Sequence, residues 1–76
     1  MDKKELDIAY FISFCIEQYK MKYNLSGKEV MNLFEKYGIS QYLTDNFEVL
    51  HTQSRQWLLE EIENYITKRK EETLWN

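Results

Sequence analysis

Residues 3–23 carry apolar side chains at intervals of three and four positions. This spacing places them on one face of an α-helix, so we predict a long helix over this range. Tyr10, Phe14 and Met21 lie off that face, and the middle of the helix is therefore apolar over most of its circumference. Such a helix is either central in its bundle or presents a second face to a partner. The predicted buried stripe consists of Ile8, Phe11, Ile12, Cys15, Ile16, Tyr19 and Tyr23.

The clearest helix start in the chain lies within residues 24–30. Ser26 is suited to accept a hydrogen bond from the backbone of Glu29, which stands three residues later. Leu25 and Val30 are spaced to touch across this start as a hydrophobic staple. A second helix is thus expected to begin directly after Ser26.

This second helix is predicted to run from Gly27 to Tyr37. Gly38 follows it, where a residue in the left-handed conformation commonly ends a helix. Ile39 would then pack back on Phe34, the contact that accompanies such an end. The inward residues are expected to be Val30, Leu33, Phe34 and Tyr37.

A short third helix is predicted next, with Ser40 as its N-cap, residues 41–45 as its body and Asn46 as its end. Residues 47–50 are apolar with one charge, and we interpret them as an extended connector. Its candidates for filling the core are Phe47, Val49 and Leu50.

The last predicted helix begins after His51, with Thr52 as N-cap and Ser54 as the alternative. It is expected to end at about Lys70, because the basic residues 68–70 suit the C-terminal end of a helix dipole. Residues 71–76 are expected to form a loosely ordered tail. The inward stripe is predicted to be Trp57, Leu58, Ile62, Tyr65 and Ile66.

Together these segments predict an all-α fold, a small bundle of three long helices plus one short helical turn. The chain has 76 residues, no proline and two glycines. It shows neither a repeat nor a linker, so we expect one helical domain over residues 1–76 with its core at about 5–70.

Residues 1–5 mix both charge signs, and the apolar run over residues 8–16 is short. Neither a signal peptide nor a membrane-spanning segment is therefore indicated. A single cysteine favours a reducing compartment. We expect a cytoplasmic location and no membrane partner.

The chain carries one cysteine, Cys15, and one histidine, His51. Cys15 lies on the predicted buried stripe, where its thiolate would be costly, so a small buried side chain is the favoured interpretation. A metal site would need more His or Cys ligands than the chain has. We therefore expect no enzymatic activity and no catalytic, cofactor-binding or metal site.

The formal net charge of −3 argues against a nucleic-acid surface, which needs clustered Lys and Arg. The turn at Gly38 between two predicted helices nevertheless resembles a helix-turn-helix corner. The helix after it carries Gln41, Tyr42 and Asp45 but neither Arg nor Lys, so an ordinary helical corner is favoured. The alternative, a small nucleic-acid-binding regulator, predicts salt-dependent retention on DNA.

Twelve of the residues are aromatic, and a small core needs only some of them. Tyr and Trp suit interfaces because they supply a large contact area with few rotatable bonds. We therefore predict a protein–protein interface, either with another protein or with a second copy in a homodimer. Its candidate residues are Tyr10, Phe14, Met21, Trp57 and Trp75.

Several segments occur in one order along the chain and together resemble a family of short bacterial proteins known only as a domain of unknown function. The resemblance covers roughly Ile8 to Ile66. It is carried by Phe14–Glu17, Ser26–Glu29, Leu33–Gly38, Tyr42–Leu43 and Asn46–Ser54. The resemblance implies no catalytic residues. It implies a gene neighbourhood that often includes ADP-ribosyltransferase-like proteins of toxin type, and hence an antitoxin-like or accessory partner role.

Overall fold

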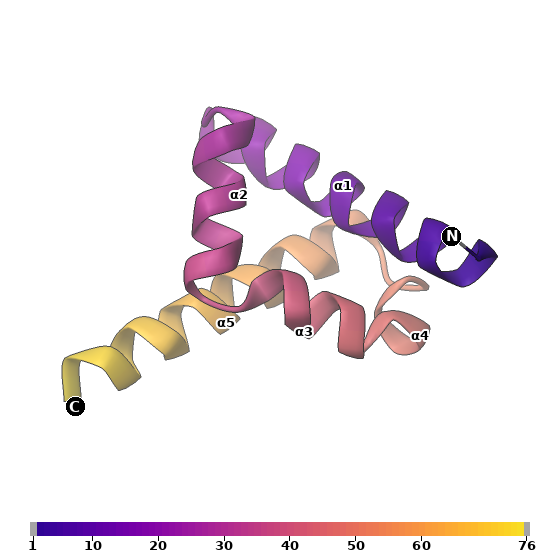
Figure 1. Ribbon diagram of the computed structural model, residues 1–76. Helices are drawn as coiled ribbons and strands as arrows, with labels where there is room; N and C mark the ends of the chain where they lie inside the picture. The colour runs from indigo at the N-terminus through magenta and orange to yellow at the C-terminus, as the bar shows by residue number, and fades with distance from the viewer. Residues whose placement is uncertain (1, 76) are drawn as a thin grey trace.

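The computed structural model describes the backbone of residues 2–75 and the side chains of residues 2–72. It is all-α over this range, as predicted, and contains no strand there. The helices are α1 (Lys3–Tyr23), α2 (Gly27–Lys36), α3 (Ile39–Asp45), α4 (Phe47–Leu50) and α5 (Arg55–Trp75) (Figure 1). The predicted count of three long helices and one short turn is wrong. Only α1 and α5 are long, with 21 residues each, whereas α2 has 10, α3 has 7 and α4 has 4.

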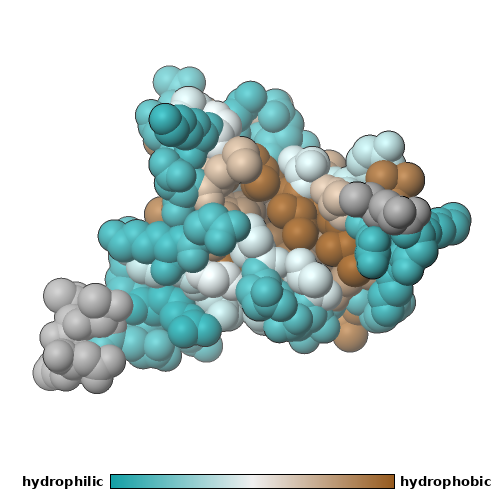
Figure 2. Space-filling model, viewed as in Figure 1, coloured by the Kyte–Doolittle hydropathy of each residue, from teal (hydrophilic) through white to brown (hydrophobic). Residues whose placement is uncertain are grey.

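The two long helices form the frame of the molecule, and the short helices connect and cover them (Figure 1). Helix α1 packs against α2, α3 and α5, while α3 also contacts α2, α4 and α5. The N-terminal end of α1 and the C-terminal end of α5 lie at opposite ends of a body of 40 × 25 × 23 Å (Figure 1). Figure 2 shows apolar surface gathered between α1 and α3 and polar surface over the C-terminal half of α5.

Helix α1 begins and ends where the sequence predicts, and local hydrogen bonds explain both ends. Asp2 caps its start, because the side-chain oxygen accepts from the backbone N–H of Glu5 at 2.8 Å. At its end Asn24 adopts the left-handed conformation with φ 53°, and the N–H of Leu25 donates to the carbonyl of Lys20 at 3.0 Å. This is a Schellman closure with asparagine in the place usually taken by glycine.

The predicted start of α2 is confirmed, because Ser26 Oγ accepts from the backbone N–H of Glu29 at 3.1 Å. The helix ends at Lys36, so Tyr37 lies just outside it. Gly38 has φ 69°, which confirms the predicted left-handed residue between α2 and α3.

The predicted cap of α3 is wrong. The helix already includes Ile39, and Gly38 stands at its N-cap without a side-chain hydrogen bond. Ser40 lies inside the helix, where its carbonyl accepts from Thr44 Oγ1 at 2.8 Å. The N-cap position is taken by Gly38, and glycine has no side chain that could accept a capping hydrogen bond. Asn46 follows the last residue of α3, as predicted.

The extended connector predicted for residues 47–50 is wrong, because this segment forms helix α4. Phe47 and Leu50 stand three residues apart, so one helical turn directs both to the core. Val49 points elsewhere and is 65% exposed, so it does not fill the core as proposed.

Ser54, the alternative cap, begins α5, because its Oγ accepts from the backbone N–H of Trp57 at 3.1 Å. The preferred assignment of Thr52 is wrong. Its hydroxyl donates instead to the carbonyl of Val49 at 3.0 Å and so closes the end of α4.

The backbone of α5 remains helical through Trp75, so a helix end at Lys70 and a loose tail directly after it are wrong. Asn76 and the side chains of residues 73–75 lie outside the described part of the chain.

The deepest part of the core is formed by side chains of α2, α3 and α5. Its most deeply buried side chains, all below 2% exposure, are Phe34, Ile39, Leu43, Ile62 and Val30. Cys15 and Tyr19 join from α1, and Leu59, which the sequence analysis missed, joins from α5. Tyr23 and Trp57 were predicted to face inward but are 43% and 39% exposed.

Within the described residues, none of the helices is long and apolar enough to cross a membrane.

Candidate interaction surface

The N-terminal half of α1, helix α4 and the start of α5 border an open depression of about 830 Å³. We call it the α1–α4 groove. Figure 1 shows α4 and the N-terminal end of α1, which border it, at the end of the molecule away from the C-terminus. Its lining residues include Tyr10, Phe11, Phe14, Phe47, His51 and Arg55.

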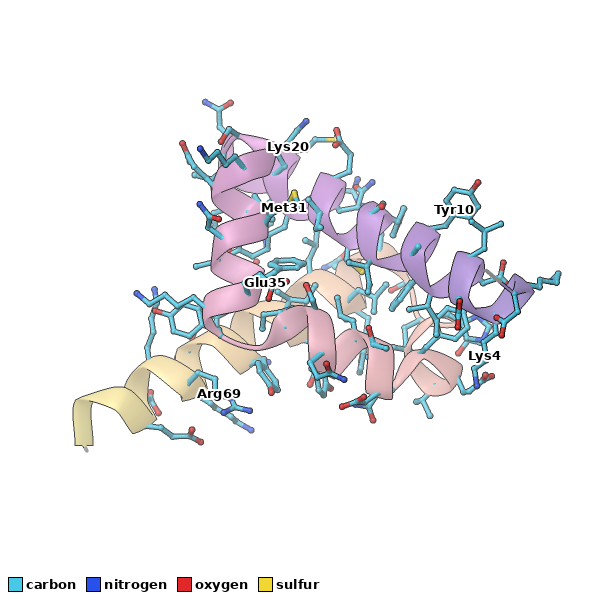
Figure 3. All side chains as sticks on the ribbon, in the orientation of Figure 1. Lys4, Tyr10, Lys20, Met31, Glu35 and Arg69 are labelled. Carbon is cyan, nitrogen blue, oxygen red and sulfur yellow. The ribbon has the colours of Figure 1, made fainter. Side chains whose placement is uncertain are left out.

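Three rings form the aromatic part of the groove, and the middle one, Phe47, contacts the other two. Phe47 meets Phe11 edge to face, with ring centroids 5.6 Å apart. On α4 the same Phe47 stacks on His51, with centroids 4.6 Å apart and ring planes 16° apart. Two further aromatic side chains remain open to solvent, since Tyr10 is 66% and Phe14 42% exposed. Figure 3 shows Tyr10 pointing away from the body of the molecule.

Paired charges line the part of the groove nearest the N-terminus. Lys4 reaches from α1 to Glu48 of α4, with its Nζ 3.2 Å from the carboxylate, and is visible in Figure 3. Lys3 pairs with Asp7 one turn along α1 at 3.4 Å. Both pairs are exposed, so each contributes little to stability.

Arg55 differs from these lysines. Its guanidinium donates to the side-chain carbonyl of Gln18 at 3.2 Å. Among the described residues, no carboxylate forms an ion pair with it. A cation on an aromatic groove without a carboxylate partner is suited to bind an acidic group of another molecule.

A second depression of about 420 Å³ lies next to the groove, and Arg55 lines both. Met21 of α1 lines this second depression and is 61% exposed. The structure therefore places Tyr10, Phe14 and Met21 along one flank of α1. We call the surface that these three side chains form the α1 flank.

The other two predicted interface residues are not brought to this surface. Trp57 lines neither depression, although it is partly exposed on α5. The side chain of Trp75 lies outside the described residues.

Phe47, His51 and Arg55 were not predicted to line an interaction surface, although the structure places all three in the groove. A signal was present, because Phe47 and His51 stand four residues apart, the spacing of neighbours on a helix. Interpreting residues 47–50 as extended concealed it.

The structure does not bring the only cysteine and histidine into one site. Cys15 is 3% exposed and belongs to the core, and burial raises the pKa of its thiol to about 12. His51 is exposed on the groove, which Cys15 does not line. Among the described side chains, no group of three His, Cys, Asp or Glu residues is placed to hold a metal ion.

The corner between α2 and α3 uses its polar side chains internally. Gln41 donates to Asp45 at 2.7 Å along α3. Tyr42 donates to Glu61 of α5 at 3.1 Å and packs its ring against Tyr65, with centroids 4.5 Å apart. Nucleic-acid binding through this corner stays a prediction, and the absence of Lys and Arg from α3 disfavours it.

Comparison with protein families gives a match over residues 10–69, from the α1 flank to the last third of α5. The matching family is described as "Protein of unknown function (DUF3791)". Neither the curated proteins nor the solved structures contain a match. The family match covers most of the chain and agrees with the resemblance to a family of unknown function. The chain therefore belongs to the DUF3791 family.

Proposed function

We propose that this chain is a non-enzymatic protein–protein interaction module that binds through the α1–α4 groove and the α1 flank. One observation carries the proposal. Tyr10, Phe14 and Met21 expose large apolar side chains along one flank of a helix whose opposite face is already packed in the core. Large apolar side chains that lie exposed on one side of a helix are typical of interaction sites.

The groove also has the composition of a binding hot spot. Its aromatic rings supply contact area at a low cost in side-chain entropy, and the pairing of Phe47 with Phe11 and His51 holds them in place. Arg55 and the lysines at its edge supply directional polar contacts. A partner helix or extended segment that presents apolar side chains would fit this arrangement.

In a finer form, the partner is an ADP-ribosyltransferase-like protein of toxin type encoded by a neighbouring bacterial gene, which this chain masks in the cytoplasm as an antitoxin. The support for this partner is the sequence resemblance and the gene neighbourhood that it implies. The exposed α1 flank is compatible with burial beneath a larger protein.

Co-expression of the chain with the neighbouring gene product, followed by gel filtration with light scattering, tests the proposal. We expect a stable complex at micromolar concentration. Phe14→Ala and Met21→Ala should each weaken it by about tenfold, as expected for contacts near 1.4 kcal/mol.

Met31→Ala is the matched control for Met21→Ala. Met31 is 57% exposed on α2 and lines neither depression, so its loss should leave the affinity unchanged. Failure of the two proteins to associate at micromolar concentration would rule out this partner. An equal loss from Met31→Ala would rule out the α1 flank as the binding surface.

A further inference from the structure

We propose that, in the protein alone, the α1–α4 groove of one copy receives the C-terminal end of α5 from a second copy. The result is a two-fold dimer in which each copy provides one groove and one helical arm. The inference rests on the proposed function in one respect, that the groove is a docking surface. The occupant is here the end of α5 from a second copy and not a different protein.

The arm is the part of α5 that continues beyond Ile66, the last buried residue among the described side chains of this helix. The side chains of residues 67–72 are all exposed, and Figure 1 shows this end of the helix projecting from the body. The sequence then places Leu74 and Trp75 in the final turn of the helix. An arm that is polar along its length and apolar at its end is suited to insert that end into another surface.

The chemistry of the arm complements that of the groove. Glu71 and Glu72 stand just before the apolar pair, and the groove offers Arg55, which forms no ion pair with a carboxylate among the described side chains. An acidic turn beside Arg55 would place the following Leu and Trp among the aromatic rings of the groove. Arginine pairs with carboxylates in a two-pronged geometry, so this contact would also fix the register of the arm.

The arm cannot reach the groove of its own chain. Arg55 is the first residue of α5 and Trp75 the last, and a helix of this length separates them by about 30 Å. The groove and the arm thus lie at opposite ends of one rigid element. Only a second copy can bring them together.

A two-fold axis that pairs the α5 helices in antiparallel fashion brings both arms to both grooves. The contact is then self-complementary, which is the usual form of a homodimer, and it closes without leaving a groove free to extend the assembly. Each dimer contains two identical groove contacts, so the buried area is doubled relative to a single insertion.

The first test is the mass of the full chain as a function of concentration, measured by sedimentation equilibrium. We expect a dimer in the micromolar range. Trp75→Ala should raise the dimer dissociation constant at least about tenfold. Trp57→Ala is the matched control, because Trp57 is the other tryptophan, is partly exposed and lies outside the groove. A wild-type chain that stays monomeric, or an equal effect of both substitutions, overturns the proposal.

A charge exchange tests the register independently of any loss of apolar area. The single variant Arg55→Glu should weaken the dimer, and so should the double variant Glu71→Arg/Glu72→Arg. The triple variant that combines these changes should form the dimer again. A glutamate at the start of α5 also suits the helix dipole, so Arg55→Glu should not impair folding. Absence of recovery in the combined variant overturns the assigned contact.

The same variants separate this proposal from the proposed function. Trp75→Ala leaves the groove intact and empty, so the monomer should bind the toxin-type partner at least as tightly as the wild-type chain. A Trp75→Ala monomer that fails to bind that partner contradicts the proposed function. That outcome does not contradict the proposed dimer. A wild-type monomer that binds the partner contradicts the dimer alone.

Discussion

The two ends of the α1–α5 frame carry similar large apolar side chains, which are buried at one end and exposed at the other. Where α2 and α3 cover the frame, Phe34 and Ile39 are fully buried. Where α4 covers it, Tyr10 and Phe14 remain exposed beside a groove. The difference follows from length, because α2 and α3 have 10 and 7 residues and α4 only 4. A single helical turn fills the end of the core with Phe47 but is too short to cover the neighbouring flank of α1.

The comparison teaches that aromatic content alone does not distinguish core from interface in a chain of this size. The covered end is expected to carry most of the stability, and the groove end is free to serve binding.

The largest effect is expected from Phe34→Ala. Phe34 is fully buried in the covered end, and removing a buried phenyl ring typically costs about 3–5 kcal/mol. The whole chain is expected to be stable by roughly 4–11 kcal/mol, so this variant should be largely destabilised. Urea denaturation followed by circular dichroism measures the change.

Phe14→Ala is the matched comparison at the groove end. Its ring is 42% exposed, so the loss in free energy of unfolding should stay below about 1 kcal/mol. Equal losses from the two variants would show that the groove end is as much a part of the core as the covered end.

Gly38→Ala tests the corner that joins α2 to α3 at the covered end. A Cβ at this position meets no atom within 4 Å, so the cost comes from the left-handed backbone alone, at about 1–2 kcal/mol. Gly27→Ala is its control, because Gly27 starts α2 in equally open space without a positive φ. That variant should be more stable by about 0.5–1 kcal/mol, and thermal denaturation of both resolves the opposite signs.

Ser54→Ala tests the start of α5 at the groove end. Its hydroxyl caps the helix through the backbone of Trp57, and losing such a cap costs about 1 kcal/mol. Thr52→Ala should cost less, because the Thr52 hydroxyl donates only to the carbonyl of Val49 at the end of α4. A larger loss from Thr52→Ala in urea denaturation would contradict the assignment of the cap.

The smallest effect concerns the contact between the C-terminal end of α1 and α5. Hydrogen bonds from Lys22 and then Tyr23 lower the pKa of the Glu63 carboxyl below its ordinary 4.5. Its contribution to stability is therefore present above about pH 4.5 and is lost as the pH falls through the lowered pKa. For an exposed pair it amounts to less than about 1 kcal/mol.

Glu63→Gln should accordingly flatten the decline of the melting temperature below about pH 4.5, relative to the wild-type chain. Glu60→Gln removes a carboxylate from the same helix without touching Lys22, and it serves as the control. A steeper decline in Glu63→Gln than in the wild type would contradict the sign of the effect.

Much of the local structure could be predicted because its causes are local. Ser26 and Glu29 lie three residues apart, so the start of α2 depends on neighbours that the sequence shows directly. Residues 47–50 were predicted wrongly for a different reason. Four residues are too few to distinguish the period of an extended strand from that of a helix. The end of α1 at Asn24 was located without its cause, because asparagine is a weaker signal than glycine for the left-handed conformation.

The candidate site could be predicted only in part. Tyr10, Phe14 and Met21 were identified because their positions on one helix follow from its period. Trp57 was grouped with them by residue type, and it is exposed on α5 but does not line the groove.

The sequence by itself determined the all-α class, the bounds of α1, the left-handed turn at Gly38 and the burial of Cys15, because period, caps and backbone preferences act over a few residues. Only the tertiary structure decided that α4 leaves a groove open, that Phe47 stacks on His51 within it, and that Arg55 stands beside it without an ion pair to any described carboxylate. These features depend on how far one short helix covers another. That coverage is determined jointly by residues that are distant in the sequence.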